Sequence, residues 1–506
     1  MPARTRIIIV GGGCFGISTA YAFAKRGTYD VILFDRQNIP APDAASTDIT
    51  KVVRFDYGSE THHMVLGLEA LPLWRELNKV SQREFGQLCF HETGVLFFGR
   101  NGQFNPFEID TMKAIRDFGY GDCIEVMENG EAILKRYPQF RTAVSNGYDI
   151  AYYNKLGGWC DSSMGVRTMH YLCKKAGVQF ITGDPDGTLS ELIFSDSSNS
   201  KVIGIKTRNG KVHYADKVIL ATGAWTPSVV DTDDLLVATG QTVIHVMPTP
   251  DQAEVFKGDK FPVWAGDWTK SGFYGFPSIA LDGRIKIARH SSGYLNPVEA
   301  NKLPIGQYQA QIARSVQSQI SVPRTKVTNP NDTIPAEALA HAQNFMREFM
   351  PQLNEMPLVE MRVCWYCDSV NGNFLISEHP RHQDLYVASG DSGHGMKFLP
   401  VVGEPIADVV EGKDPVRAGV SLKALWAWNR DTSVGGNGGM EGRKEDFTGD
   451  GKAPELKQME VSSSSQKHKG DVLRAGWTEE RPVLGQGLGK MVPHEVLIEG
   501  RAKAKL

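Results

Sequence analysis

The feature that most constrains this chain is a glycine-rich turn near its start. Residues 7–10 form an uninterrupted apolar run, Ile-Ile-Ile-Val, which is typical of a strand buried on both faces. The turn at residues 11–16 reads Gly-Gly-Gly-Cys-Phe-Gly, matches G-x-G-x-x-G and leads into a predicted helix. A second apolar strand, at residues 31–34, ends at Asp35. This order of strand, turn, helix and strand predicts a Rossmann-like unit that binds a dinucleotide.

The glycines of this turn each have a physical reason. Gly11 permits the tight turn, Gly13 lets a pyrophosphate approach backbone N–H groups at the start of the helix, and Gly16 allows close packing of helix on strand. Asp35 can accept hydrogen bonds from ribose hydroxyls, and its charge disfavours a 2′-phosphate. A glycine turn that binds no nucleotide is the alternative. The predicted dinucleotide contacts in this unit are Gly11, Gly13, Cys14, Phe15, Gly16 and Asp35.

A later strand favours one of the two common dinucleotides. Residues 218–220 are apolar, and the chain continues as Ala-Thr-Gly to Gly223. This pattern resembles the second signature of flavoproteins, at which the chain returns to the dinucleotide. FAD is therefore the favoured cofactor, with Gly223 as a further contact. An NAD-dependent dehydrogenase stays an alternative, because it would share the glycine turn and Asp35.

The remaining patterns predict an α/β (α+β) fold. Helical spacing at residues 164–176 and 335–350 accompanies short strands at 385–388 and 95–98 and a strand pair within 272–288. This mixture predicts a substrate domain, built on a mixed or antiparallel sheet, inserted into a Rossmann-like FAD-binding domain. The predicted division is an FAD-binding domain at 1–60, 151–235 and 360–430, a substrate domain at 61–150 and 236–359, and a tail at 431–506.

The tail differs in composition from the rest of the chain. From Ser433 onward it is rich in Gly, Ser, Lys and Glu and shows no sustained apolar period, so we expect it to be flexible, although residues 484–498 could dock. Its last residues, Ala504-Lys505-Leu506, are a variant of the Ser-Lys-Leu peroxisomal address. We therefore expect a peroxisomal import receptor as a partner and a peroxisomal location, with a cytoplasmic one as the alternative.

Charge and cysteine content exclude several classes of protein. The chain has 55 Lys and Arg against 58 Asp and Glu, so it lacks the basic excess of a nucleic-acid-binding protein. No apolar run approaches the roughly 18 residues of a spanning helix, so we expect no membrane insertion. Seven scattered cysteines do not suggest a disulfide framework, and no second Cys or His pair completes a zinc site, so we expect reduced thiols and no metal.

Three motifs in the C-terminal half resemble one family. Residues 362–367 read Arg-Val-Cys-Trp-Tyr-Cys, residues 373–376 read Asn-Phe-Leu-Ile, and residues 390–398 read Gly-Asp-Ser-Gly-His-Gly-Met-Lys-Phe. They resemble the sarcosine oxidase and fructosyl amino acid oxidase family, flavin amine oxidases of the D-amino-acid-oxidase-like superfamily, and fungal-type members in particular. The resemblance runs from Ile7 to Asn429. It implies that the flavin is contacted by Gly393, Gly395, Met396 and Lys397.

The resemblance implies a covalent flavin. In this family the matching cysteine, here Cys364, is joined through sulfur to the 8α-methyl group of FAD, whereas Cys367 has no such counterpart. A thiolate is the competent nucleophile toward an electron-poor flavin methyl group, and a nearby cation favours thiolate. A redox pair with Cys367, half of a zinc site and plain core thiols are the alternatives.

The resemblance also implies the residues around the substrate. Arg54 and Lys397 match the positions that clamp the substrate carboxylate, an arrangement that binds an anion strongly when desolvated. Taken singly, either residue could be a solvated surface charge. Thr47 stands where sarcosine oxidases carry a histidine, so the substrate can differ from sarcosine.

Further residues match the strand pair that roofs the site in this family. Lys286 would lie beside flavin N5, where its charge stabilises superoxide, and Lys51 would contact the flavin and support the same field. Tyr274 and His290 would line the substrate pocket. An aromatic strand residue and a single histidine are also common as plain core residues.

The sequence thus predicts an oxidase of a secondary amine or N-alkyl amino acid. By the family's chemistry, hydride leaves the carbon next to nitrogen for flavin N5, an imine forms, and O2 is reduced to H2O2. A biosynthetic oxidase of a fungal isoquinoline-alkaloid pathway, whose iminium is captured by an internal phenol ring, is an alternative that a larger open pocket would favour. An NAD-dependent dehydrogenase and a non-catalytic flavin-binding protein are alternatives of other classes. The chain is expected to act as a monomer.

Overall fold

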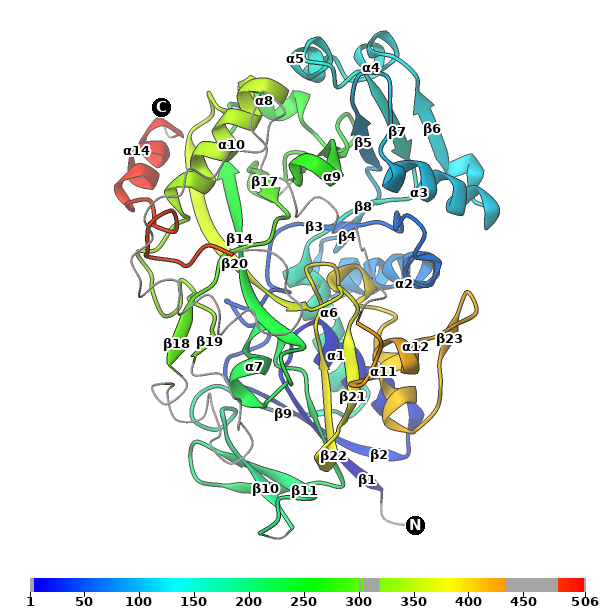
Figure 1. The fold of residues 1–506 in the computed structure, drawn as a ribbon, viewed down its shortest axis with the longest axis vertical. Coiled ribbons are helices and arrows are strands. Elements are labelled where there is room, and N and C mark those ends of the chain that lie inside the picture. The colour runs from blue at the N-terminus through cyan, green and yellow to red at the C-terminus, as the bar shows by residue number, and fades with distance from the viewer. Residues whose placement is uncertain are drawn as a thin grey trace.

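The polypeptide is organised around two large sheets, one in the lower and one in the upper half of Figure 1. The computed structural model describes residues 4–195, 197–279, 281–299, 303, 319–432 and 481–504. The predicted α/β (α+β) fold class is confirmed, because a mostly parallel sheet with helices is joined to a mostly antiparallel one.

The lower sheet has six strands, and five successive ones, from β22 to the edge strand β9, run parallel. The edge strand β21 alone is antiparallel to its neighbour β22. Alternate side chains of β1 enter different cores: Ile7 and Ile9 face the helices, whereas Ile8 and Val10 face a small second sheet. In sheet order the strands are β21 (Leu375–His379), β22 (His382–Ser389), β13 (Lys217–Leu220), β1 (Thr5–Val10), β2 (Tyr29–Asp35) and β9 (Gln179–Thr182).

Both faces of this sheet are covered, as the continuous apolar run in β1 predicts. One face packs against α1 (Cys14–Arg26), α2 (Thr61–Phe85), α6 (Ser162–Lys175) and α11 (Gly403–Val410). The other packs against a three-stranded antiparallel sheet of β10 (Leu189–Phe194), β11 (Val202–Thr207) and β12 (Val212–Tyr214).

The upper sheet has eight strands and a separate aromatic core. Trp264 and Phe349 both pack against Phe345 with nearly parallel rings in this core, where α10 (Ala336–Phe349) covers the sheet. The only parallel neighbours are β15 and β5. In sheet order the strands are β20 (Leu358–Ser369), β14 (Leu236–Val246), β17 (Ile285–Arg289), β16 (Phe273–Gly275), β15 (Val263–Gly266), β5 (Val95–Gly99), β7 (Ile150–Asn154) and β6 (Ile124–Met127).

Short elements complete the described part of the chain. The small sheets pair β3 (Lys51–Val53), β8 (Gly158–Cys160) and β4 (Phe90–His91); β18 (Pro297–Glu299) and β19 (Gln319–Ser321); and β23 (Val416–Arg417) and β24 (Val420–Ser421). The other α-helices are α3 (Pro106–Asp117), α4 (Gly130–Arg136), α5 (Arg141–Ser145), α7 (Thr226–Val229), α8 (Pro250–Val255), α9 (Trp268–Ser271), α12 (Leu422–Leu425) and α14 (Glu495–Ala504). Single 3₁₀ turns span Gly121–Cys123, Pro138–Phe140, Gly223–Trp225, Pro351–Leu353 and Met396–Phe398. No helix in this part of the chain has both the length and the apolar character needed to cross a membrane.

The sheets and cores differ from the predicted domain bounds in three places. Helix α2, assigned to the substrate domain, packs in the core of the six-stranded sheet. Strands β7 and β20, assigned to the FAD-binding domain from residues 151 and 360, belong to the eight-stranded sheet. The division into an FAD-binding and a substrate domain stays a prediction. Within it, α2 goes with the six-stranded sheet, and β7 and β20 go with the eight-stranded sheet.

The end of the chain also departs from the prediction. Residues 433–480 of the predicted tail lie outside the described residues, but residues 481–504 are folded onto the eight-stranded sheet. Leu497 of α14 is fully buried in its aromatic core, and Arg501 Nε donates to the Val359 carbonyl at 3.0 Å. In Figure 1 this red segment lies beside α10. Residues 481–504 therefore follow the alternative expectation, that residues 484–498 dock, because their few apolar side chains pack against distant strands.

Candidate functional site

A cavity of about 490 Å³ opens at the glycine turn. Its walls come from the carboxyl ends of β1, β2, β13 and β22, where a doubly wound sheet binds its ligands. Of the predicted dinucleotide contacts, the residues that line it are Gly11, Gly13, Cys14, Phe15, Asp35, Lys51, Gly223, Gly393, Gly395 and Met396. Gly16 lies behind the turn and Lys397 lines a neighbouring cavity.

The turn needs its glycines for the packing reasons that the motif predicts. Gly11 has a φ of +104°, and a Cβ placed there would lie 2.3 Å from the Ala221 carbonyl oxygen. A Cβ on Gly16 would lie 1.8 Å from the Gly11 oxygen. Gly13 is the N-cap of α1, and a Cβ there would meet only Ser46 Oγ, at 3.2 Å. Gly13 therefore keeps the start of the helix open toward the cavity, whereas Gly11 and Gly16 hold helix and strands together.

Asp35 is tied to the turn that it faces. Its Oδ2 accepts from the Gly12 amide at 2.8 Å and its Oδ1 from the Gln37 amide at 2.9 Å. Burial raises the pKa of this carboxyl group, an effect that these two amides oppose. Each oxygen has a further lone pair, so the carboxylate can still accept from a hydroxyl in the cavity.

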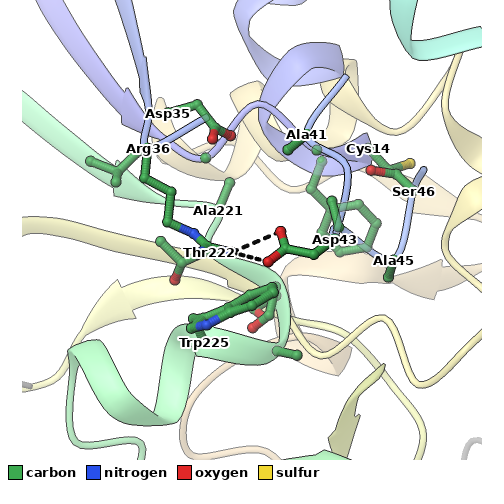
Figure 2. A pocket seen from close by; sticks show the side chains of 18 of the residues that line it. Cys14, Asp35, Arg36, Ala41, Asp43, Ala45, Ser46, Ala221, Thr222 and Trp225 are labelled. Atoms are coloured by element: carbon green, nitrogen blue, oxygen red, sulfur yellow. Dashed lines mark hydrogen bonds and ion pairs between the residues drawn. The ribbon is translucent and has the colours of Figure 1, made fainter. Parts of the chain in front are cut away.

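A stacked cation beyond Asp35 was not found from the sequence. Figure 2 shows the Arg36 guanidinium over the Trp225 ring and joined to Asp43. The guanidinium carbon lies 4.2 Å from the ring centroid, and Arg36 Nη2 lies 2.9 Å from Asp43 Oδ1. An indole and a guanidinium are flat surfaces suited to a planar ring such as adenine. The sequence offers no motif for this contact, because Trp225 lies far along the chain from Arg36 and Asp43.

A second, smaller cavity of about 60 Å³ adjoins the first. The two cavities share Lys51, Tyr366, Gly393 and Met396 in their walls. The four predicted substrate residues all line the smaller one: Arg54, Tyr274, His290 and Lys397. The structure therefore brings them together next to the dinucleotide cavity.

Arg54 is buried within an aromatic enclosure. Its guanidinium carbon lies 5.0 Å from the Tyr57 ring centroid and 5.7 Å from that of Trp268. The Trp268 ring also stacks on His290, with centroids 5.4 Å apart and an angle of 8° between the planes. The alternative of a solvated surface arginine is thus wrong, since the side chain is 6% exposed.

Lys397 heads a directed chain of hydrogen bonds. Its Nζ donates to Tyr57 Oη at 3.0 Å and to the His394 carbonyl at 2.9 Å. His394 Nε2 lies 3.0 Å from the Gly372 carbonyl, which can only accept, so Nε2 carries the hydrogen and Nδ1 is the acceptor. Tyr57 Oη, 3.1 Å from that Nδ1, therefore donates to it. Burial and then Arg54 hold the pKa of Lys397 well below its ordinary value.

Cys364 lies on β20 beside a cation. Its sulfur is 3.6 Å from Lys51 Nζ, and it packs with Tyr366 and Tyr274. Burial alone would lower the pKa of Lys51, but the Cys364 sulfur and Asp48 raise it, so this lysine stays charged. Cys367 belongs to a different apolar cluster, because residues three apart on a strand point to opposite faces. The two cysteines therefore form no redox pair.

Asp48 forms ion pairs with three cations. No sequence motif indicated this residue. Its Oδ2 lies 2.5 Å from Lys286 Nζ and 3.3 Å from Lys51 Nζ, and its Oδ1 lies 2.9 Å from Arg362 Nη2. Burial would raise the pKa of Asp48, but Arg362, Lys286 and Lys51 hold it well below its usual range.

Lys286 differs from the other two cations in the direction of its pKa shift. Burial lowers the pKa of Lys286 to about 8, although the charge of Asp48 opposes this effect. Lys286 lines neither cavity. Its neighbour Lys51 lines both.

One group of possible metal ligands lies behind Lys397. Single ligand atoms of Glu60, His62 and His63 lie within 4.8 Å of one another, and all three residues are buried. Within the group, His63 Nδ1 and Glu60 Oε2 are 3.1 Å apart. Burial, Lys397 and Arg54 lower the pKa of His63 to about 3, so the same surroundings would oppose a metal cation.

The chain is similar over most of its length to several known oxidases. L-saccharopine oxidase of Schizosaccharomyces pombe is 26% identical over 84% of this chain and 93% of its own length. Monomeric sarcosine oxidase of Bacillus sp. (strain B-0618) is 27% identical over 81% of this chain and 93% of its own length. The crystal structure of a modified fructosyl peptide oxidase from Aspergillus nidulans superposes with a TM-score of 0.73 at 27% identity, covering 86% of this chain and 95% of that one.

The family match spans both sheets. The family of FAD dependent oxidoreductases matches residues 6–409, from the first strand of the glycine-turn unit into α11. The matched stretch includes the glycine turn, the strand before Gly223, Cys364 and the segment that ends at Lys397. The chain thus belongs to the family of FAD dependent oxidoreductases.

Proposed function

We propose that this protein oxidises a secondary amine of the N-alkyl amino acid type, forms an imine, and passes the electrons to O2 to give H2O2. The observation that carries the proposal is the pair of buried cations, Arg54 and Lys397, in a small cavity beside the dinucleotide cavity. The sarcosine and saccharopine oxidases among the relatives support the same class of substrate. This proposal replaces the dehydrogenase and scaffold alternatives.

The chain's own residues bind the acid end of such a substrate. Arg54 can offer a two-pronged donor to a carboxylate, and Lys397 can offer a third N–H besides the two that it gives to Tyr57 and His394. Arg54 depresses the pKa of Lys397, so an anion between them would restore the charge on the lysine. The walls of Trp268 and His290 exclude water and strengthen these contacts.

The residues of the larger cavity fit FAD. The open N-terminus of α1 suits a pyrophosphate, Asp35 suits a ribose, and the Arg36–Trp225 stack suits an adenine. When bound, FAD supplies the hydride acceptor and the route of electrons to O2. Lys51 stands where the two cavities meet, so its charge acts on both.

We also propose that Cys364 carries the flavin through sulfur. The position of Cys364 supports this link, because its sulfur lies 3.6 Å from Nζ of Lys51, a residue that lines both cavities. Acid denaturation tests it: a yellow pellet supports the link, whereas a yellow supernatant over a white pellet contradicts the link and leaves FAD in place.

The size of the substrate cavity favours a compact substrate. At about 60 Å³ it is far smaller than the 300–1,000 Å³ or so typical of sites for drug-sized ligands. This supports a small N-methyl or cyclic amino acid over the bulky phenolic amine of an alkaloid pathway. Peroxide release measured with a panel of N-methyl amino acids, cyclic amino acids and phenolic amines tests this choice. Turnover of the phenolic amines alone would contradict the proposal.

For location, we propose the peroxisome, through binding of the C-terminus to the import receptor. Helix α14 ends at Ala504, and Lys505 and Leu506 lie outside the described residues. The sequence Ala-Lys-Leu carries this proposal, and a peroxide producer suits that compartment. A fluorescent protein fused before residue 1 should give punctate signal that becomes diffuse without the last three residues. Diffuse signal from both would favour the cytoplasm.

A further inference from the structure

We propose that Asp48 is a positioning residue that fixes Lys286 against Lys51 and Arg362 and keeps its amine protonated for the reaction with oxygen. The inference rests on the proposed oxidase function for the role of Lys286. It goes beyond that function because it assigns a task to a carboxylate that no sequence motif singled out.

Geometry is the first support. Lys286 and Asp48 are both about 1% exposed, and Lys286 Nζ donates to Asp48 Oδ2 at 2.5 Å and to the Thr50 carbonyl at 2.6 Å. The same carboxylate reaches Arg362 through Oδ1 and Lys51 through Oδ2. One anion therefore sets the spacing of three cations that come from β3, β17 and β20.

Asp48 is itself held in place by backbone contacts. Its amide donates to Ser162 Oγ at 3.0 Å, and Ser162 Oγ donates back to the Asp48 carbonyl at 2.9 Å. Ser162 begins α6, which packs in the core of the six-stranded sheet. The backbone of Asp48 is thus fixed to the core of the six-stranded sheet, which also holds the glycine turn. The ion pairs of its carboxylate in turn fix where the three cations lie.

Charge balance is the second support. The ionisable groups that face Lys286 are Asp48 from the loop before β3, Lys51 from β3, Arg362 from β20 and His245 from β14. Of these, Asp48 is the anion, and it opposes two neighbouring cations and the cost of burial. Glu360 is engaged by Arg284 at 2.7 Å. Without the Asp48 charge, the Lys286 amine would lose its proton at a lower pH.

This predicts a pH dependence with a definite sign. A lysine is charged below its pKa, so the rate at which O2 reoxidises the reduced enzyme should fall as pH rises through about 8. In Asp48→Asn the fall should move to lower pH by about one unit or more, because an opposite charge at this distance raises a lysine pKa by that much. The rate of anaerobic reduction by substrate should change less than the rate of reoxidation.

The experiment measures reoxidation rate against pH by stopped flow for the wild type, Asp48→Asn, Lys286→Met and Asp161→Asn. Asp161 is the matched control, since its side chain is half-buried and close to Asp48 but caps α6 through the Met164 amide at 2.8 Å. Asn is a good N-cap, so Asp161→Asn should keep the wild-type profile. A profile for Asp48→Asn that superposes on the wild type would overturn the inference.

A second readout separates this inference from the oxidase function. The Lys286 amine is titrated by NMR of protein labelled with ¹³C at lysine Cε, with Lys286→Met to assign the signal. A lower pKa of Lys286 in Asp48→Asn, together with fast reoxidation of Lys286→Met, would refute the oxygen role and keep the positioning role. An unchanged Lys286 pKa in Asp48→Asn, together with slow reoxidation of Lys286→Met, would refute the positioning role and keep the oxygen role. If Asp48→Asn does not fold, Asp48→Glu, which keeps the charge on a longer arm, takes its place and should show an intermediate shift.

Discussion

At the scale of single residues, two groups of buried cations differ in how their charge is balanced. Lys51, Lys286 and Arg362 surround a shared carboxylate, whereas Lys397 is depressed in pKa by burial and by Arg54. In the first group, each cation is already paired with Asp48 before any substrate binds. The second gains most from an incoming anion, so we expect substrate carboxylates to bind at Arg54 and Lys397.

The carboxylate clamp is tested by Arg54→Met. We expect kcat/KM for a carboxylated substrate to fall roughly 30-fold or more, mainly through KM, since truncating one partner of a buried charge pair costs about 2 kcal/mol or more. Steady-state peroxide assays measure it, with the matching amine that lacks the carboxylate as control substrate. Equal losses for both substrates would show that Arg54 supports the fold and not the clamp.

The hydrogen-bond chain is tested by Tyr57→Phe. Loss of the hydroxyl leaves His394 Nδ1 and one N–H of Lys397 without this partner, which costs about 1–3 kcal/mol. We expect KM to rise by roughly 5-fold to 150-fold with the flavin content unchanged. Tyr148→Phe, which removes a buried hydroxyl in the core of the eight-stranded sheet, is the control and should leave KM as in the wild type.

The sulfur link is tested by Cys364→Ala. This variant should release all of its FAD into the supernatant on acid treatment, whereas Cys367→Ala should keep a yellow pellet, because Cys367 lies in a different apolar cluster. Absorbance of pellet and supernatant measures the outcome. A yellow pellet from Cys364→Ala would place the attachment at another residue.

At the scale of elements, the glycine turn fixes the geometry of the cofactor end. In Gly16→Ala the new Cβ would lie 1.8 Å from the Gly11 backbone oxygen, so helix and turn must separate. We expect low FAD content and a lower Tm, measured by absorbance and calorimetry. Gly27→Ala, at the open C-cap of α1 with no atom within 4 Å but a φ of +72°, should cost only about 1 kcal/mol and keep FAD.

Sequence patterns predict elements better than they predict their partners. The strands at 7–10 and 31–34 and the helix at 164–176 lie within a residue or two of β1, β2 and α6, because apolar period and turn glycines are local. The predicted domain bounds separate α2 and β20 from the sheets that they join, because which core a helix or strand joins depends on distant residues. Asp48 was missed for the same reason: two of its three cations are more than 200 residues away.

At the scale of the whole molecule, residues 481–504 close the core of the eight-stranded sheet. The backbone of Val483 pairs with Leu295 and that of Met491 with Pro335, and Leu497 is fully buried. Leu497→Ala should destabilise the fold by about 2–5 kcal/mol, as for other buried leucines. Thermal unfolding measures it, with the exposed Ile498→Ala as control. Equal Tm values for the two variants would show that α14 adds no stability.

The common wall of the two cavities has a consequence for how such an enzyme diversifies. A change at Lys51, Tyr366, Gly393 or Met396 alters the surroundings of cofactor and substrate together, so it puts redox behaviour at risk. Phe97, Trp264, Trp268 and His290 line the substrate side only. Natural variation that adapts a descendant to a new amine should therefore accumulate at these four positions, while the shared border stays constant.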